Sequence, residues 1–93
     1  MPTPFFGVTR VVADARCEQG IASARAHQVP IELVTEAAAI IAAYIARGEV
    51  IMSRRDTIGA LCGPGQTRRV VSYLKARGHV ERTEDRDLIR PVG

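Results

Sequence analysis

The feature that most constrains this chain is the stretch "PGQTRRVVSYLKARGHVERTEDRDLIRPV", residues 64–92. Val70, Val71 and Leu74 recur in it at helical spacing, which places an apolar face on one side of a helix and basic side chains on the other. The periodicity then changes to that of two short strand-type runs, "HVERT" and "LIRPV". This order predicts a helix over residues 64–77 that leads directly into a β-hairpin.

The two strand-type runs flank the polar segment Glu84-Asp85-Arg86-Asp87. Because this segment contains no glycine, we expect a loop of about four residues between the strands and not a tight two-residue turn. Pro91 has no N–H group to donate to a sheet ladder, so it favours an edge position for the second strand.

The middle of the chain carries clear helix signals. Pro30 favours a helix start, and "IELVTEAAAIIAAYIARG" has a broad apolar face that runs to Gly48, a natural C-terminal stop. The run "EVIM" that follows is either a brief strand or a packed connector. Ser53 is placed to cap a short helix that ends at Gly63, and "PGQT" then forms a compact turn into the last helix.

The N-terminal part has a weaker pattern. Residues 1–7 contain two prolines and a glycine and are typical of an irregular arm, which Phe5 and Phe6 would pin to the body of the protein or to a second subunit. A weak apolar stripe over residues 8–27 predicts a helix, either continuous or broken at Gly20.

These patterns together predict a mainly α protein with a small β-hairpin, in the α+β class. We expect an N-terminal arm and helix over residues 1–30, available for dimerisation, and one folded domain over residues 31–93. A chain of 93 residues is too small to enclose a large catalytic cleft easily.

Charge is segregated along the chain, although the net charge is only +3. Residues 1–53 carry four arginines and five acidic side chains, a balance of −1. Residues 54–77 carry six basic side chains and one acidic side chain, a balance of +5. Such segregation predicts an anionic partner for this second segment, and nucleic acid is the usual candidate. The alternative is a basic face that is merely solvated or paired with acidic groups elsewhere in the protein.

Several classes of protein are not expected from this sequence. Cys17 and Cys62 lie far apart, and His27 and His79 are single, so the chain lacks metal-ligand spacing and we expect no metal or cofactor. The chain shows neither the spacing of a nucleophilic triad nor a phosphate-binding loop, so we expect a protein that is not an enzyme. Without an apolar run of about 18–20 residues or a signal-type start, it is predicted to be soluble and cytoplasmic.

The segment "RRDTIGALCGPGQTRRVVSYLKARGHVERTEDRDLIRPV" resembles the DNA-binding part of small bacterial or mobile-element regulators of the winged helix-turn-helix superfamily. Within it, "VVSYLKARGHVER" looks like the end of their recognition helix, with an apolar pair, a leucine, a basic residue, a glycine stop and a first wing strand. The resemblance covers residues 31–92 and implies a winged helix-turn-helix fold with an extra N-terminal helix or arm. Pro64-Gly65 and the acidic hairpin loop depart from the usual pattern.

A helix that reads the major groove meets base edges with its N-terminal residues, while the preceding helix crosses the DNA backbone. The predicted base-reading residues are Gln66, Thr67, Arg68, Arg69 and Ser72. The predicted backbone contacts are Ser53, Arg54, Arg55 and Lys75. The candidate wing contacts on the hairpin are Arg82, Arg86 and Arg90. The carboxylates between them count against a wing contact, because phosphates repel them.

The leading prediction is therefore a sequence-specific transcriptional regulator that binds double-stranded DNA as a homodimeric repressor on a palindromic site. The alternative is a protein-interaction module of a mobile element, such as an anti-CRISPR-type inhibitor, which uses the same scaffold without reading DNA. Non-specific DNA binding in chromosome architecture or replication is a third interpretation. A steep loss of affinity with salt is expected only for DNA binding through several phosphates.

Overall fold

The computed structural model describes residues 10–93, so the predicted arm, with Phe5 and Phe6, lies outside the described residues. In chain order the elements are α1 (Arg10–Arg16), α2 (Glu18–Ala26), α3 (Ile31–Ala46), β1 (Met52–Ser53), the π-helical turn η1 (Arg55–Gly59), α4 (Ala60–Cys62), α5 (Pro64–Ala76), β2 (Val80–Arg82) and β3 (Leu88–Pro91). Mainly helical structure with one small antiparallel sheet confirms the predicted α+β class.

α3 forms where the sequence predicts the longest helix, directly after Pro30. Val34, Ala37 and Ile41 are buried on its apolar face, and the chain leaves the helix at Gly48, whose φ of +74° favours glycine. Within residues 10–93, no helix is by itself long and apolar enough to cross a membrane, whereas α2 and α3, which meet at an angle of 114°, reach that length and composition as a pair.

The N-terminal helical pattern is interrupted at Cys17 and not at Gly20. Cys17 is the N-cap of α2, and its Sγ atom accepts a hydrogen bond from the backbone N–H of Gly20 at 3.4 Å. Gly20 lies inside α2, where an added Cβ atom would sit 1.8 Å from the carbonyl oxygen of Asp14 in α1. Glycine is therefore needed here because α1 and α2 approach closely, and it does not break the helix.

Ser53 caps the short helical segment that follows β1. Its hydroxyl accepts a hydrogen bond from the backbone N–H of Asp56 at 3.0 Å, as the sequence predicts. The segment consists of η1 continued by α4, and it ends at Gly63 with a φ of +76°. Pro64 is the first residue of α5, which confirms the predicted helix start at residue 64, and the compact turn expected at "PGQT" is the first turn of that helix. Proline suits this position because the N–H group that it lacks would have no partner within the helix.

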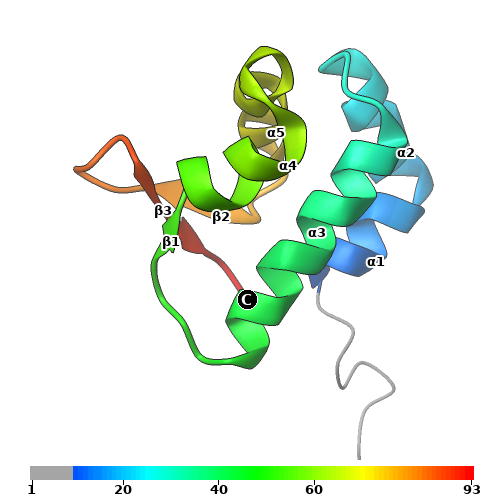
Figure 1. Ribbon diagram of the computed structural model, residues 1–93. Coiled ribbons are helices and arrows are strands. Elements are labelled where there is room, and N and C mark those ends of the chain that lie inside the picture. The colour runs from blue at the N-terminus through cyan, green and yellow to red at the C-terminus, as the bar shows by residue number, and fades with distance from the viewer. Residues whose placement is uncertain (1–9) are drawn as a thin grey trace, which may run out of the picture.

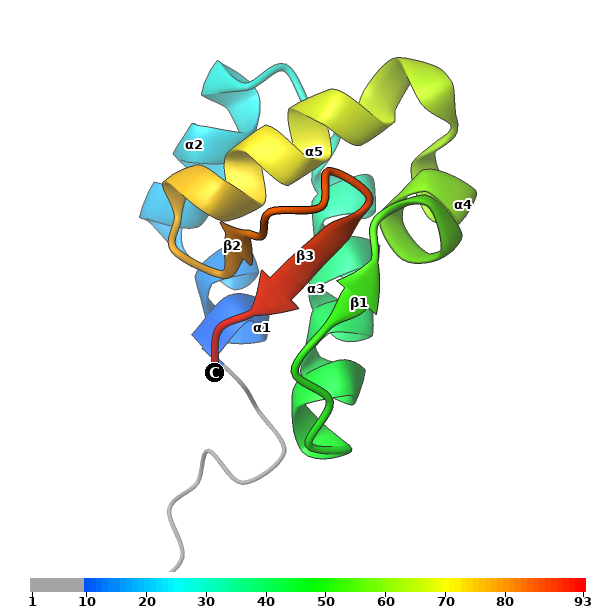
Figure 2. The same cartoon turned by 90° about the vertical axis from the view of Figure 1, so that its left-hand side faces the viewer.

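The three strands form an antiparallel sheet in the order β1-β3-β2, with β3 in the middle (Figure 2). Met52 pairs with Ile89, and Val80 pairs with Pro91. The predicted hairpin is confirmed, but the prediction of an edge strand for Pro91 is wrong, because β1 adds to the other side of β3. β1 is so short that it reaches only Leu88 and Ile89, and Pro91 pairs with β2 alone. The missing N–H group of Pro91 therefore interrupts no ladder with β1.

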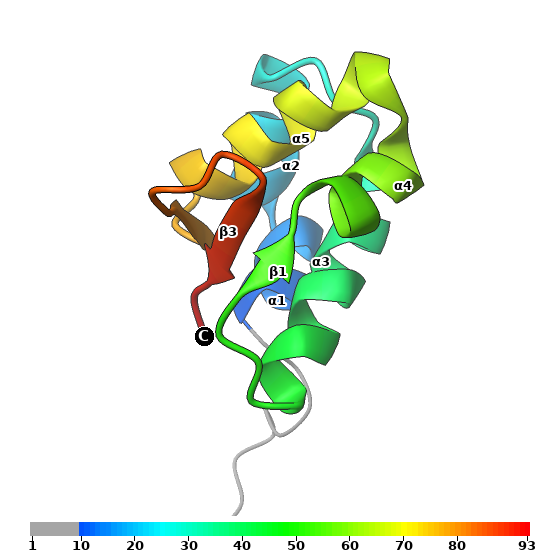
Figure 3. The ribbon, with the colours of Figure 1, turned by 60° about the vertical axis from the view of Figure 1, so that its left-hand side comes forward.

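One hydrophobic core joins all these elements. Figure 1 shows α1 and α2 on one side of α3 and the sheet on the other, and Figure 3 shows α4 and α5 joined at one end of the molecule above β1 and β3. Val11, Ala15 and Ala24 from the two N-terminal helices are buried in the same core as α3 and α5. The predicted boundary at residue 30 therefore does not separate two cores, because residues 10–30 pack onto α3 as part of the same domain.

Candidate functional site

α5 has one buried and one exposed face, as its periodicity predicts. Val70, Tyr73 and Leu74 are fully buried and attach the helix to the core. The opposite face exposes the polar side chains Arg68, Arg69, Ser72 and Lys75. Because the apolar face is fully used by the core, the basic face has to point towards solvent.

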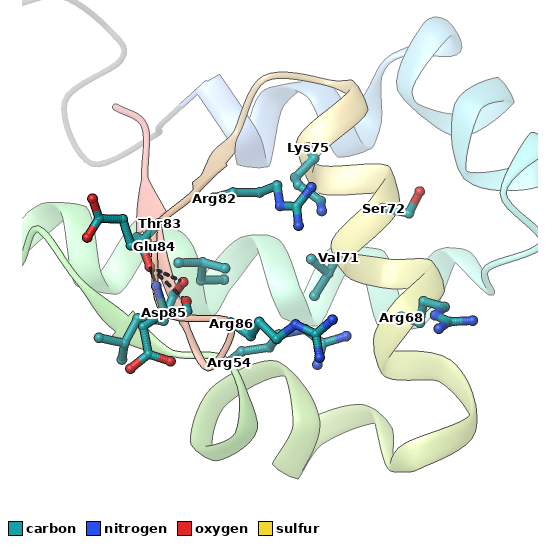
Figure 4. A pocket seen from close by; sticks show the side chains of 12 residues that line it. Arg54, Arg68, Val71, Ser72, Lys75, Arg82, Thr83, Glu84, Asp85 and Arg86 are labelled. Atoms are coloured by element: carbon teal, nitrogen blue, oxygen red, sulfur yellow. Dashed lines mark hydrogen bonds between the residues drawn. The ribbon is translucent and has the colours of Figure 1, made fainter.

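A groove runs between the exposed face of α5 and the hairpin, and Figure 4 shows the side chains that line it. Arg54 follows β1, Arg68 and Lys75 stand on α5, Arg82 comes from β2 and Arg86 from the hairpin loop. Figure 4 shows Arg82 extending towards Lys75, and Arg54 and Arg86 extending in a common direction towards α5. We call these five side chains the basic groove. Three separate parts of the chain thus bring their cations to one surface.

Glu84 and Asp85 of the hairpin loop also line the groove, but in the described part of the chain they form no ion pair with its cations. Within residues 10–93, none of its five cations forms an ion pair. Figure 4 shows the carboxylate of Glu84 directed away from α5. Asp85 Oδ1 accepts a hydrogen bond from the backbone N–H of Asp87 at 2.9 Å, and the Thr83 hydroxyl donates to the carbonyl oxygen of Asp85 at 2.8 Å. These hydrogen bonds form within the loop itself, and the cations of the groove stay without a carboxylate partner within the described residues.

Two of the predicted contact residues use their side chains within the protein. Thr67 is buried, and its hydroxyl donates to the carbonyl oxygen of Gly63 at 2.6 Å, so the prediction that it reads a base does not fit its position. Ser53 uses its hydroxyl as the cap of η1. Gln66 is half-buried, and its Oε1 atom is buried without a hydrogen-bond partner within the described residues.

Three predicted arginines lie outside the basic groove. Arg69 is exposed on α5 but does not line the groove. Arg55 lines a second cleft between η1, α4 and the start of α5, together with Asp87 and two arginines of the basic groove. Arg90 forms an exposed ion pair with Glu81, with an N–O distance of 3.4 Å. The structure therefore brings together only part of the set that the sequence predicts.

A polar cluster that no sequence pattern predicts surrounds Asp14 in α1. The Asp14 carboxylate accepts hydrogen bonds from Nε of Arg77 at 2.8 Å and from its Nη2 at 2.6 Å. Nε2 of His79 lies 2.8 Å from the same carboxylate. Arg10, at the start of α1, donates to the carbonyl oxygens of Arg77 and Gly78 at 3.4 and 2.6 Å. We call Asp14, Arg77 and His79 the Asp14 cluster; no spacing in the sequence links its members.

Charge and burial shift the titration of the Asp14 cluster. The hydrogen bonds from Arg77 hold the pKa of Asp14 well below its usual range, against the opposing effect of burial. Burial lowers the pKa of His79 below its ordinary value of 6.5, although the adjacent carboxylate opposes this. Burial also raises the pKa of the neighbouring Tyr73 to about 12. At neutral pH the cluster therefore pairs an ionised Asp14 with a charged Arg77 and a neutral His79.

Comparisons of the chain with protein-family models, with curated proteins and with solved structures found no match. In the part of the chain that the structure describes, no three His, Cys, Asp or Glu side chains are grouped to hold a metal ion. The chemistry that the site does carry is electrostatic: unpaired cations along a groove beside an exposed polar helix face attract an extended polyanion.

Proposed function

We propose that residues 31–93 form a winged helix-turn-helix domain and that the protein is a sequence-specific transcriptional regulator of double-stranded DNA. The element order α3, β1, η1 with α4, α5, β2 and β3 supports this fold, as does the position of β3 between the other two strands. In this proposal α5 enters the major groove and the hairpin is the wing. α1 and α2 are additions that cover α3.

The observation that carries the proposal is the basic groove. A major groove about 12 Å wide admits one α-helix, whose exposed face must be polar to meet base edges. α5 offers such a face, and the hairpin arginines stand beside it where the adjacent phosphates of a duplex would lie. In this proposal the α5 wall supplies contacts to base edges and the hairpin wall supplies contacts to phosphates. These are the two kinds of contact that sequence-specific DNA binding needs.

The proposed base readers are the exposed polar residues Arg68, Arg69 and Ser72 of α5, whereas the buried Oε1 atom counts against a base contact by Gln66. Arginine donates two hydrogen bonds to O6 and N7 of guanine, and each good pair discriminates against a wrong base by about 1–3 kcal/mol. The proposed phosphate contacts are Arg54, Arg55, Lys75, Arg82 and Arg86. Phosphate contacts position the domain without reading sequence.

We further propose that the protein acts as a homodimeric repressor. A single small domain contacts few base pairs, and two-fold pairing on a palindrome doubles those contacts. Two copies related in this way would place their α5 helices in successive major grooves, about 34–36 Å apart. A selected motif with two inverted half-sites at that spacing supports the dimer, and a motif without symmetry contradicts it.

Selection of bound sequences from a random duplex library tests the function, and we expect one enriched motif. The variant Arg68→Ala/Arg69→Ala should weaken binding to that motif by at least about 30-fold, since two base-reading pairs are lost. Arg16→Ala/Arg25→Ala is the matched control, because it removes two exposed arginines of α1 and α2 that do not line the groove, and its affinity should be unchanged. Unaltered binding by the α5 variant would refute the assignment of α5 as the reading helix.

A protein-interaction module is the second candidate, and the exposed carboxylates of the hairpin loop favour it. In that function the acidic loop would meet a basic partner protein, and the protein would not bind duplex DNA. A salt titration separates the two candidates. With five phosphate contacts in each domain, the slope of log affinity against log salt concentration should be about −4.5 for a single domain and about −9 for the proposed dimer. An absence of duplex affinity at low salt would support the interaction module.

A further inference from the structure

The Asp14 cluster lies at the turn between the two walls of the basic groove. α5 ends at Ala76 and β2 begins at Val80, so residues 77–79 alone connect the helix wall to the hairpin wall. Gly78 in this turn has a φ of +77°, a conformation that favours glycine. The orientation of the hairpin relative to α5 therefore depends on this turn, together with the burial of Val80 and Ile89 in the core and the pairing of β3 with β1.

α1 fixes the turn from both sides. Asp14 binds Arg77 before Gly78 and His79 after it, with donor–acceptor distances of 2.6 to 2.8 Å. Arg10 adds bonds to the carbonyl groups of the same turn. The side chains of Asp14 and His79 are only 13% and 1% exposed, so water competes little for these bonds. Hydrogen bonds to a charged group are strong in such surroundings.

We propose that Asp14 is a positioning residue for DNA binding, which holds the turn between α5 and the hairpin so that both walls of the basic groove contact one duplex. This inference rests on the proposed function and deepens it, because it gives the N-terminal helix a role in the same site. Asp14 contacts Arg77 and His79 and does not line the groove. Without its charge, the hairpin arginines lose their fixed position relative to those of α5.

A merely structural role for Asp14 predicts a different result from a positioning role. If Asp14 only stabilised the fold, its loss would lower the folded fraction, and the contribution of each DNA contact in the folded protein would be unchanged. If Asp14 positions the hairpin, its loss removes the benefit of the hairpin arginines while those of α5 still bind. The two roles differ in whether Asp14 and the hairpin arginines are energetically coupled.

A double-mutant cycle on the affinity for the selected duplex measures this coupling. The four proteins are the wild type, Asp14→Asn, Arg82→Ala/Arg86→Ala and their combination, each at low salt and at a temperature where circular dichroism shows it folded. Loss of two phosphate contacts should weaken the wild type by about 10-fold or more. The same loss should weaken the Asp14→Asn protein by less than about twofold, because its hairpin no longer reaches the phosphates. Additive effects would overturn the inference.

Tyr73→Phe is the matched control for a change beside the cluster. Tyr73 is as buried as His79, and its hydroxyl has no hydrogen-bond partner within the described residues. The hairpin substitutions should therefore weaken Tyr73→Phe as strongly as they weaken the wild type. If Asp14→Asn does not fold, Arg77→Lys replaces it, since lysine keeps the charge beside Asp14 but lacks the two-pronged donor geometry. In the Arg77→Lys protein the hairpin substitutions should again have less than their wild-type effect. If their effect is instead the same as in the wild type, the inference is overturned.

The inference and the proposed function fail in different ways. A wild-type protein without duplex affinity at low salt overturns both. A wild type that binds its selected duplex, combined with additive effects in the cycle, overturns only the positioning role of Asp14.

Discussion

The two ends of α5 place arginine in opposite settings. Arg68, near the start of the helix, is exposed, lines the basic groove and forms no ion pair within residues 10–93. Arg77, directly after the helix, is held through Nε and Nη2 against Asp14. Both belong to the segment that carries a charge of +5 in the sequence. A count of basic residues therefore overstates the charge available to a partner, because the carboxylate of Asp14 in a distant helix already pairs with Arg77.

The acidic side chains show the same contrast. Those of the hairpin loop are exposed, and Asp85 accepts a hydrogen bond from the backbone of its own loop. Asp14 is largely buried and binds side chains more than 60 positions away in the chain, Arg77 at a sequence separation of 63. Changes in the loop should therefore alter binding with little effect on stability, whereas changes at Asp14 should lower the stability of the domain as well as the contribution of the hairpin arginines to binding.

The largest expected effect is that of Asp14→Ala on stability. The substitution should lower the free energy of unfolding by about 2–3 kcal/mol, because it leaves Arg77 and His79 without their partner. This is less than for a fully buried pair, since the Arg77 side chain is 27% exposed. Urea denaturation measures the change. Arg68→Ala, at the other end of α5, is the control, and its free energy of unfolding should stay within about 0.5 kcal/mol of the wild-type value. Equal losses of stability in the two variants would contradict the difference between the two ends of α5.

A pH dependence of stability should come from the same cluster. Burial keeps the pKa of His79 below 6.5 in the folded protein; Asp14 favours the charged imidazole, whereas Arg10 and Arg77 oppose it. The unfolded chain then takes up a proton near pH 6.5 that the folded protein does not bind. Stability is therefore complete above pH 6.5 and is lost as the pH falls through the lower folded-state pKa.

Denaturation curves at a series of pH values test this dependence. The wild type should lose stability as the pH falls from 6.5 to 5, and His79→Gln should lose less over the same range. Asp14 should not contribute to the change, because its pKa is lowered and its stabilisation is lost only below pH 3.8. Parallel curves for the two proteins would show that His79 is not the responsible group.

A smaller effect is expected from Lys75→Ala. Lys75 is exposed on α5 and lines the basic groove, as Arg68 does. Its removal should reduce the steepness of log affinity against log salt by about 1 for each bound domain and leave the selected motif unchanged. Arg47→Ala, at the end of α3 and outside the groove, is the control and should leave the slope as it is. A changed motif with an unchanged slope would instead place Lys75 at a base.

The smallest effect should be that of Arg90→Ala. Arg90 and Glu81 are 53% and 59% exposed, and their N–O distance is 3.4 Å. An exposed pair of this kind contributes little, so we expect a change below about 0.5 kcal/mol in the free energy of unfolding. Duplex affinity should also be unaffected, because Arg90 is paired with Glu81 and is not one of the proposed DNA contacts. If Arg90→Ala lowered the free energy of unfolding as much as Asp14→Ala does, exposed and buried ion pairs would contribute equally to the stability of this protein, contrary to the prediction.

Much of the fold could be predicted from local patterns. The apolar period of α3, the Ser53 cap and the glycine stops at Gly48 and Gly78 are all where the sequence places them. Each of these signals acts over one or two helical turns, so neighbouring residues are enough to set it. The exposed face of α5 follows in the same way, because its apolar face has to meet the core.

The predictions that failed concern contacts between distant segments. Pro91 was placed on an edge strand because β1, which pairs with β3, has only two residues and a weak signal. The N-terminal stripe predicts a helix that is either continuous or broken at Gly20, because propensity does not show that α1 lies against this residue. Thr67 carries a polar side chain in a basic segment, and only the carbonyl group of Gly63 beside it shows that its hydroxyl is occupied.

The amino-acid sequence by itself determined the long middle helix, the hairpin at the C-terminal end and the basic face of α5, since periodicity, caps and stops are local. Only the tertiary structure decided which cations meet in the groove and which one is bound by Asp14. Electrostatic pairing depends on distances in space, and the packing that brings residue 14 to residues 77 and 79 leaves no repeating signal along the chain.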